Sequence, residues 1–442
     1  MKRYIRAARS ASGSLLLALA AAHAAPVLAK DDLLETLARK GVISADEYAK
    51  LKDQQPKSSA PTLSTDDGLK FASADGAFSL QVGALQQIDY AAFDADGSDL
   101  SDGTELRRSR LSLGGTLFKD WQYRVEYEFA KSAAVTQVTD AYVAYTRLKP
   151  FTVTIGQFKP SFSMEALSQD KSATFMERAL PFYIVSPLIV RAPGVQLSDS
   201  GTHWSMAGGI FGAPLGDSSS GDEGWGAAAR ATAAPYLTEK AVVHLGLGAT
   251  WRKPTADNNG TPPAATSAVA FSAKPESNQA PSFLSTKAML DVTSFRIVGT
   301  ELAGACGPAS LQSEYEWIKV ERDNGQDDLA FTTWYLQFAY TLTGEVRPYK
   351  VDRGVFDGIK PVKSFGASGW GAFEAAARIS QLDLNDGSVT GGNMRDMTLG
   401  VSWYLNAFMR ISANYVKVLK LDGGTYDDQK PSVYQMRLQL AF

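Results

Sequence analysis

Cysteine and histidine are nearly absent from this chain of 442 residues. Cys306 is the only cysteine, so no internal disulfide and no site with several cysteine ligands can form. Of the three histidines, His203 and His244 lie beyond the N-terminal region, and neither has a serine-nucleophile motif or metal-ligand spacing beside it. Nucleophilic catalysis needs a nucleophile, a base and an orienting group within mutual reach. The sequence therefore predicts a protein that is not an enzyme and that needs no cofactor or metal ion.

The chain also lacks any long hydrophobic run, since no stretch approaches the about 20 apolar residues of a membrane-spanning helix. The apolar residues 15–22 are too few, but they follow a basic start and precede small residues, as in a secretory signal. We expect this signal to cover residues 1–29, with Ala24 and Ala25 as alternative cleavage positions. A membrane protein without spanning helices must be a closed barrel, because every backbone polar group has to be paired inside lipid.

What the chain does have is strict alternation, which is clearest at its C-terminus. Positions 434, 436, 438, 440 and 442 are apolar, whereas Gln435, Arg437 and Gln439 lie between them. Side chains alternate faces along a strand, so this pattern predicts one face toward lipid and one toward water. An apolar strand that ends on Phe442 is typical of outer-membrane barrels, in which it is recognised by the barrel-assembly machinery.

Sixteen segments from residue 77 onward read as strands. Short connections such as 119–120, 148–150, 201–202 and 406–407 alternate with long ones, as in outer-membrane barrels. The sequence therefore predicts an all-β fold, a 16-stranded antiparallel transmembrane β-barrel over residues 77–442. The segments are 78–91, 105–118, 121–131, 136–147, 151–158, 193–200, 203–212, 224–234, 240–252, 285–302, 308–322, 329–342, 368–382, 394–405, 408–419 and 432–442.

The region between the signal and the barrel reads as two parts. Residues 30–56 predict a short helical hairpin, in which Gly41 ends the first helix and Ser44 caps the second with Glu47 three residues later. This periplasmic segment is either a coiled-coil or trimerisation element or a loosely ordered extension. Residues 57–76 are rich in Pro, Ser and Thr at their start and are expected to form a linker.

Four separated motifs resemble one known family over residues 77–442. They are Leu106-Arg107-Arg108 with Leu113-Gly114-Gly115-Thr116, Gly156-Gln157-Phe158-Lys159-Pro160 with Phe175-Met176-Glu177-Arg178, Tyr340-Thr341-Leu342-Thr343-Gly344-Glu345, and Trp403-Tyr404-Leu405-Asn406. The stretches are similar to those of the phosphate-selective porins O and P. The resemblance implies a homotrimer in the bacterial outer membrane, in contact with its lipids and lipopolysaccharide, that passes small anions such as phosphate through a basic constriction.

The charge distribution supports a local anion path. Without residues 1–29 the chain has 40 basic and 47 acidic side chains, which predicts no nucleic-acid binding, yet residues 107–191 hold twelve basic and seven acidic ones. With Leu111 and Leu113 toward lipid, Arg108 and Arg110 face the lumen, whereas Arg107 faces outward or lies at a bulge. Rings of basic side chains at a narrow point select anions. The predicted constriction comprises Arg107, Arg108, Arg110, Arg124, Lys159, Lys171 and Arg178.

Two long connections are expected to shape the pore. Residues 159–193 form the third loop, which folds inward in sixteen-stranded porins, although Glu177 and Arg178 could pair to fix this loop and Lys159 could simply set its exit. The connection at 343–367 stands where a short turn is expected. Its basic residues resemble the periplasmic lysine cluster of the family, and a surface turn of mixed charge is the other interpretation. They are Arg347, Lys350, Arg353, Lys360 and Lys363.

Other features argue against strict phosphate selectivity. The first strand offers no basic residue to the lumen, and the first long loop is acidic at Asp94, Asp96, Asp99, Asp102 and Glu105. The sequence thus predicts passive diffusion of small anions, with phosphate or polyphosphate as the expected solute class. A general, weakly selective porin is the alternative, and an outer-membrane barrel enzyme or adhesin is a more distant one.

Overall fold

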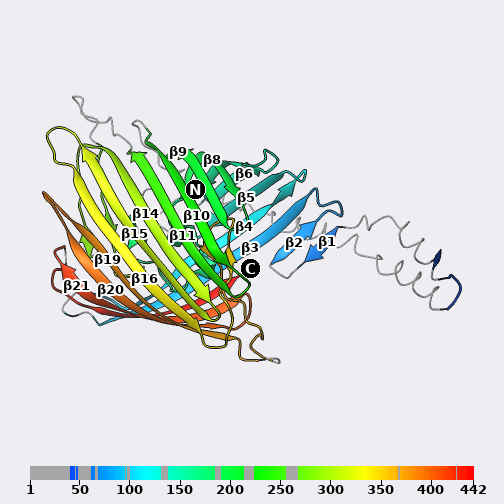
Figure 1. Ribbon diagram of the computed structural model, residues 1–442. Coiled ribbons are helices and arrows are strands. Elements are labelled where there is room, and N and C mark those ends of the chain that lie inside the picture. Colours follow the sequence, from blue (N-terminus) through cyan, green and yellow to red (C-terminus); the bar gives the residue numbers. More distant parts are fainter. Residues whose placement is uncertain are drawn as a thin grey trace, which may run out of the picture. The chain divides into compact units, whose positions relative to one another are not determined.

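The computed structural model describes residues 40–44, 46–47, 61–64, 68–94, 96, 100–130, 138–184, 191–213, 223–254, 267–366, 369–424 and 426–442. Sixteen strands pair antiparallel with their neighbours along the chain, and β22 pairs with β3 to close a barrel (Figure 1). The first eight strands are β3 (Ser79–Asp94), β4 (Gly103–Leu117), β5 (Trp121–Glu128), β6 (Val138–Tyr145), β7 (Thr152–Phe158), β8 (Ala192–Ser200), β9 (Trp204–Phe211) and β10 (Trp225–Leu237). The other eight are β11 (Ala241–Lys253), β14 (Val292–Cys306), β15 (Ala309–Arg322), β16 (Leu329–Thr341), β19 (Ala372–Asp386), β20 (Val389–Tyr404), β21 (Met409–Asp422) and β22 (Ser432–Ala441).

The sixteen-stranded antiparallel barrel predicted from the sequence is confirmed. Each predicted segment overlaps one strand, and the largest boundary error is at 285–302, where β14 begins only at Val292. Among the described residues, no helix is long and apolar enough to cross a membrane.

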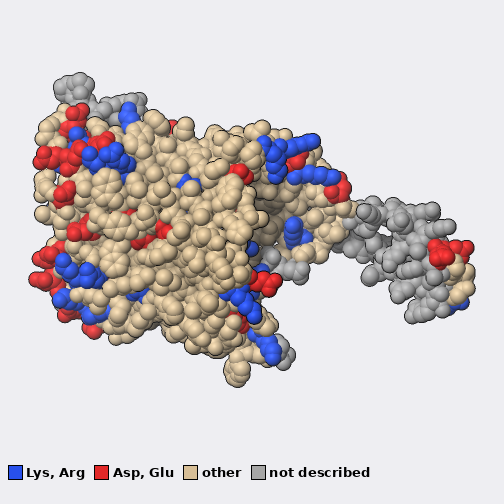
Figure 2. All heavy atoms as spheres, in the orientation of Figure 1, with Lys and Arg blue, Asp and Glu red and all other residues tan. Residues whose placement is uncertain are grey.

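Alternation along the strands separates an apolar outside from a polar inside. In β22, Tyr434 and Met436 are 53% and 54% exposed, whereas Gln435 and Arg437 are 4% and 2% exposed. Charged side chains accordingly gather near the ends of the strands on the face drawn in Figure 2, with a mostly uncharged band between them. Such a band is what the hydrocarbon core of a bilayer requires of a barrel.

The connections differ between the two ends of the barrel. At one end, which we call the turn end, most connections are short, as at 118–120, 201–203, 238–240 and 307–308. The connections at the other end, the loop end, include the long segments between β7 and β8 and between β11 and β14. The segment between β16 and β19 is the long exception at the turn end.

Three connections fold into the barrel interior and determine its shape. The inward loop, residues 159–184, contains α3 (Met164–Leu167) and the 3-10 helix η1 (Asp170–Ser172). The inner hairpin, residues 267–291, contains β12 (Ser272–Ala273) and β13 (Leu284–Ser285), which pair with each other. The turn-end segment, residues 342–366, contains β17 (Tyr349–Lys350) and β18 (Val355–Phe356). Only the inward loop was predicted to enter the lumen.

Two short strands precede the barrel, in the part that was predicted to be a linker. They are β1 (Thr62–Ser64) and β2 (Leu69–Ala72), which pair with each other, and β2 also pairs with β3. Farther upstream, Ser44 N donates to Glu47 Oε2 at 2.9 Å and Glu47 N donates to Ser44 Oγ at 3.2 Å, the two hydrogen bonds of a capping box. The signal and most of the helical hairpin predicted for 30–56 lie outside the described residues.

Candidate functional site: the charged wall of the lumen

The inward loop is docked against β4 through one carboxylate, that of Asp170. Arg110 Nη1 lies 2.6 Å from Asp170 Oδ2, Arg178 Nη2 lies 2.9 Å from Oδ1, and Arg108 Nε lies 3.4 Å from Oδ2. Burial alone would raise the pKa of Asp170, but the guanidiniums of Arg108 and Arg110 hold the pKa well below its usual range. Asp170 is therefore a charged anchor that three arginines share.

Glu177 forms a second anchor at the far end of the same loop. Arg107 Nε donates to Glu177 Oε1 at 2.8 Å, and Arg437 Nη2 of β22 lies 2.7 Å from the same oxygen. Arg437 also pairs with Asp89 of β3 at 2.6 Å. Burial would raise the pKa of Glu177, yet Arg107 and Arg437 keep this pKa below its ordinary value. The loop is thus tied to the seam where the barrel closes.

A bulge explains why Arg107 reaches the interior. The pairing of β3 with β4 shifts between Gln87, which faces Arg108, and Ile88, which faces Leu106. Arg107 is therefore the extra residue, as one of the two sequence interpretations predicted. Arg107, Arg108 and Arg110 therefore all pair with carboxylates of the inward loop, which strict alternation would not allow for the adjacent Arg107 and Arg108.

The charged surface continues onto β5 and β6, away from the seam. Arg124 Nη2 lies 2.5 Å from Glu126 Oε2, and Arg124 Nε lies 3.5 Å from Asp140 Oδ2. Arg191, just before β8, also pairs with Asp140 at 2.9 Å. The Arg124 side chain is 39% exposed, more than that of Arg191 at 12%.

A line of side chains crosses the closing seam next to η1. Arg108 Nη1 donates to Gln87 Oε1 at 2.7 Å, and Gln87 Nε2 donates to Gln439 Oε1 at 2.7 Å. Arg410 Nη2 donates to the same Gln439 oxygen at 3.3 Å, while Gln439 Nε2 donates to the backbone oxygen of Lys171 at 3.0 Å. The side-chain amides of Gln87 and Gln439 therefore lie between the guanidiniums of Arg108 and Arg410 and link them by hydrogen bonds.

Arg410 and Lys171 differ from the paired arginines. Arg410 is 2% exposed and donates to the Ala173 oxygen at 2.7 Å, and among the described residues it forms no ion pair with a carboxylate. Its guanidinium instead lies 5.4 Å from the centre of the Tyr404 ring. Lys171 is exposed on the inward loop. We call the surface formed by β3–β6, β21, β22 and the inward loop the charged wall.

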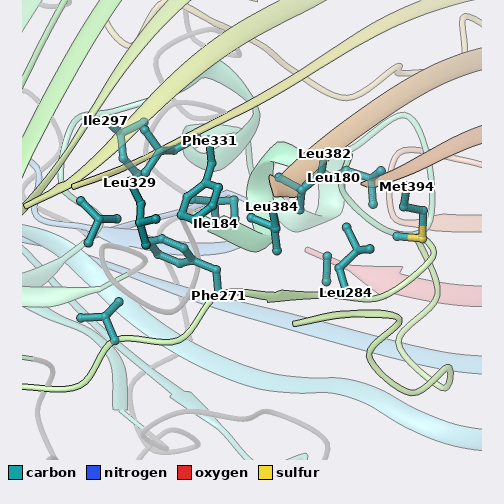
Figure 3. Close-up of a cluster of buried hydrophobic side chains, with 14 of the residues drawn as sticks. Leu180, Ile184, Phe271, Leu284, Ile297, Leu329, Phe331, Leu382, Leu384 and Met394 are labelled. Atoms are coloured by element: carbon teal, nitrogen blue, oxygen red, sulfur yellow. The ribbon is translucent and has the colours of Figure 1, made fainter. Parts of the chain in front are cut away.

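The inner hairpin packs against the inward-facing side chains of β14, β15, β16 and β19–β21 near the loop end, and this part of the interior is apolar. Figure 3 shows Phe271 and Leu284 of the hairpin and Leu180 and Ile184 of the inward loop beside strand residues that face inward. We call this surface the apolar wall. Its fully buried strand residues include Ile297, Ile318, Leu329, Phe331, Leu382, Leu384, Met394 and Val418.

A buried ion pair fastens the hairpin to the apolar wall. Arg378 of β19 donates from Nη2 to Glu276 Oε2 at 2.5 Å, and Ser380 Oγ donates to Glu276 Oε1 at 2.5 Å. Both charged side chains are 1% exposed. At the hairpin's other side, Asn278 Nδ2 donates to Glu105 of β4 at 2.8 Å. The hairpin therefore crosses the interior from β19 to β4.

The turn-end segment is anchored in the same way from the other end. Arg347 forms a buried ion pair with Glu374 of β19, and Arg230 Nη2 of β10 donates to the Gly354 oxygen at 2.8 Å. Ser172 Oγ of the inward loop donates to Asp357 Oδ1 at 2.8 Å. This segment consequently meets the inward loop inside the barrel.

Residues 80–442 match the family model described as phosphate-selective porin O and P. The chain belongs to this family. It is similar to porin O of Pseudomonas aeruginosa, with 29% identity over 409 residues, covering 86% of this chain and 92% of that one. A protein of Caulobacter vibrioides is 31% identical over 405 residues, covering 87% of this chain and 78% of its own.

Solved structures support the same fold at lower identity. An anion-selective porin from Comamonas acidovorans aligns with a TM-score of 0.50 and 14% identity, covering 83% of this chain and all of that one. The in-vitro folded trimer form of OmpT of Vibrio cholerae aligns with a TM-score of 0.52 and 12% identity, with the same coverages. The protein is therefore an outer-membrane porin, a channel and not an enzyme. Because porins have short periplasmic turns, the turn end is periplasmic.

The structure places the predicted constriction residues of this porin in two groups. Arg107, Arg108, Arg110 and Arg178 are held in ion pairs with the two anchors of the inward loop. Lys159 and Lys171 belong to the loop itself, and the Lys159 ammonium donates to the Ala166 oxygen at 2.7 Å. Burial, with help from Arg178, lowers the pKa of Lys159 well below its usual range. Glu177 and Arg178 do fix the loop, but through different partners.

The predicted exit residues are also divided. The interpretation of 343–367 as a surface turn is wrong for Arg347, which is buried because Glu374 lies inside the barrel wall. Lys350, Arg353, Lys360 and Lys363 are exposed on the same segment, and Lys350 Nζ lies 3.7 Å from Asp357 Oδ2.

Sequence reasoning missed the polar cluster that holds the turn-end segment. His244 Nδ1 lies 2.6 Å from the Tyr349 hydroxyl, and its Nε2 lies 3.0 Å from Glu301 Oε2, which also pairs with Arg230 at 2.6 Å. The one indication in the sequence was that His244 alternates with outward-facing residues and so faces the barrel interior. The sequence did not identify Tyr349 as the partner of His244, because the two residues lie 105 positions apart in the chain.

Proposed function

We propose that this porin passes small anions, phosphate or polyphosphate among them, along the charged wall. The observation that carries the proposal is the concentration of guanidinium and ammonium groups around the inward loop, where Arg410 and Lys171 add to the paired arginines. Arginine matches phosphate oxygens with two parallel hydrogen bonds, and lysine acts as a point charge. A field of one sign near low-dielectric walls raises the local concentration of the opposite ion.

The carboxylates of the charged wall set the expected strength of this selectivity. Asp170, Glu177, Glu126 and Asp140 neutralise most of the arginines that they hold. Among the described basic residues of this wall, Lys171 is exposed and Arg124 is partly exposed, so a solute can reach these two side chains. Arg410 is buried and contributes only through its field. We therefore expect a clear but moderate preference for anions, which keeps the general diffusion porin as the second candidate. The acidic side chains near Asp94 favour this second candidate, because they repel anions at the extracellular entrance.

The turn-end segment is the proposed exit. Lys350, Arg353, Lys360 and Lys363 are exposed on it, and Ser172 joins the segment to the inward loop through Asp357. An anion that leaves the loop would thus meet further positive charge on the periplasmic side. Arg347 has a different role in this proposal, since it holds the segment in place.

We further propose that the porin is a homotrimer whose interface includes the outer face of β3 and β4. Gln86 lies at the middle of β3 and alternates with inward-facing Gln87, so its amide points away from the lumen, next to Ser109 of β4. Lipid tails offer no hydrogen bonds to an amide, and a protein partner does. The trimer form of a structural relative is consistent with this assembly. Residues 1–29 as a secretory signal, contacts with lipopolysaccharide, and recognition of Phe442 by the assembly machinery belong to the same proposal.

The test is the reversal potential of the purified full-length porin in a planar bilayer under a KCl gradient. A chloride-selective potential, followed by block of the chloride current when phosphate is added, would support a phosphate-binding anion channel. An anion preference without block would favour the general porin with weak selectivity. A cation-selective potential would contradict the proposal.

A further inference from the structure

We propose that the outer face of β10 binds one acyl chain of a phospholipid from the periplasmic leaflet, in a groove made by small side chains. The residues of β10 that alternate with inward-facing Arg230 and Thr232 are all alanine over four consecutive outward positions. They are Ala227, Ala229, Ala231 and Ala233. Because alanine side chains are short, the outer surface of β10 is recessed relative to the outer surfaces of the neighbouring strands.

Larger side chains form the two banks of this groove. Leu197 of β8 and Met206 of β9 are 44% and 42% exposed on one side, and Leu247 of β11 and Val298 of β14 are 56% and 38% exposed on the other. The groove is open to the outside and has a volume of about 540 Å³, and its lining is almost entirely apolar. Gly208 of β9 widens it, because it has no side chain beside Ala229.

The groove has the length and the depth of one lipid tail. The outward alanines span six residues, which is about 20 Å at about 3.3 Å per residue, within an apolar band of about 25 Å. At the loop end, Trp225 and Trp251 pack with their ring centres 4.8 Å apart, and Tyr236 lies exposed at the other end of β10. Aromatic side chains at both ends of an apolar strand mark the two membrane interfaces.

The position of the groove favours a lipid over a second copy of the chain. β3 is the first and β10 the eighth of sixteen strands, so the groove lies about half-way round the barrel from Gln86 and Ser109. In a ring of three subunits, the side opposite the interface faces the bilayer. This step rests on the trimer proposed above. Protein interfaces also need about one hydrogen bond per 100–200 Å², and the centre of this groove offers none.

A lipid chain is also the occupant that can fill the groove. Bilayer lipids compete with each other for the surface, so association depends on packing contacts, and a concave strip left empty would lose them. The groove reaches the periplasmic end beside Phe151 and Asp199. The carboxylate of Asp199 at this end favours a headgroup that carries an amine.

Native mass spectrometry of the full-length porin, titrated with phosphatidylethanolamine or phosphatidylglycerol, tests the proposal. We expect one phosphatidylethanolamine per chain to be retained, and a loss of at least about tenfold in affinity when Ala229→Phe and Ala231→Phe fill the groove. Ala413→Phe, on the outer face of β21, is the matched control and should retain the lipid. Trimer mass and anion selectivity should not change in either variant, so this test stands apart from that of the channel.

Three results would overturn the proposal. If the filled variant retains lipid as the parent does, the groove is not the site. If filling the groove dissociates the trimer, it is an interface between copies of the chain. Equal affinity for the two lipids would overturn the role of Asp199 in choosing the headgroup.

Discussion

The charged wall and the apolar wall of this porin are built from the same kind of strand and differ in what the loops bring to them. On the charged wall, β4 carries Arg107, Arg108 and Arg110, and the inward loop supplies Asp170 and Glu177 as their partners. On the apolar wall, Leu329 and Phe331 of β16 are buried in the same hydrophobic cluster as Phe271 and Leu284 of the inner hairpin. Each loop therefore matches the chemistry of the wall on which it lies.

This difference divides the interior into a wet side and a dry side. Buried apolar side chains exclude water, whereas ion-paired arginines at the edge of a lumen stay partly hydrated and keep a local field. A solute that carries its hydration shell would follow the charged wall. In the function proposed above, the charged wall sets the selectivity of the porin and the apolar wall its rigidity.

The largest effect should come from reversing charge on the charged wall. Arg108→Glu together with Arg110→Glu puts two carboxylates beside Asp170 and Glu128, so the inward loop loses its anchor. Breaking a buried pair costs about 3–5 kcal/mol, and repulsion adds to this. We expect a lower urea midpoint and larger, more variable single-channel conductance. Arg108→Lys with Arg110→Lys is the control, and a reversed charge that left both quantities unchanged would contradict the anchoring role of Asp170.

The next effect should come from the ion pair that fastens the hairpin. Arg378→Ala leaves the Glu276 carboxylate buried without its cation, at an expected cost of about 3–5 kcal/mol in unfolding free energy. The double variant Arg378→Met with Glu276→Gln should recover most of this loss, because no unpaired charge remains. Urea unfolding of the two variants measures it. Equal destabilisation in both would mean that the pair does not act as a unit.

A smaller effect should come from an exposed cation on the inward loop. Lys171→Glu should shift the reversal potential toward cation preference while the urea midpoint stays within about 0.5 kcal/mol of the parent, since Lys171 is exposed. Lys363→Glu, exposed on the turn-end segment, is the control and should shift the potential less. A larger shift for Lys363→Glu would move the selective point from the inward loop to the periplasmic exit.

The smallest effect should come from pH between 8 and 5. The Asp170 and Glu177 carboxyls have a lower pKa in the folded protein than in the unfolded chain. Their contribution to stability is therefore complete above the unfolded pKa of about 4 and is lost as the pH falls through the folded values. Single-channel conductance should stay constant down to about pH 5 and should change only below about pH 4. A transition between pH 6 and 8 would assign the control of the loop to other groups.

Much of the fold followed from the sequence because period-two alternation is a local signal. Leu111 and Leu113 set the register of β4 and correctly directed Arg108 and Arg110 inward. The inner hairpin was not predicted, because its contacts join residues more than 100 positions apart, as Glu276 and Arg378 do. A signal was present, however: Leu329 and Phe331 are apolar on the face that also carries Thr333, so both faces of β16 are apolar at its loop end. Strands that are apolar on both faces are covered on both.

The candidate site was predicted in its residue types and not in its pairing. Six of the seven basic residues belong to the inward loop or pair with it, whereas Arg124 pairs with Glu126 and Asp140. Only the structure assigns the arginines to carboxylates, and it leaves Arg410 without one among the described residues. Arg410 and Arg437 were missed as parts of the charged wall, because β21 and β22 are distant in sequence from β4. The closed barrel was predicted, but the local patterns do not say which side chains of β21, β22 and β4 meet across the closing seam.

The most direct test of the two-sided interior compares thiol accessibility on the two walls. In a Cys306→Ser background, Lys171→Cys places a thiol on the charged wall and Leu384→Cys places one on the apolar wall. A negatively charged thiosulfonate reagent, added during recording in a planar bilayer, should reduce the current through the Lys171→Cys channel and leave the Leu384→Cys channel unchanged. Equal reaction at the two positions, or reaction at Leu384→Cys alone, would contradict an ion path along the charged wall.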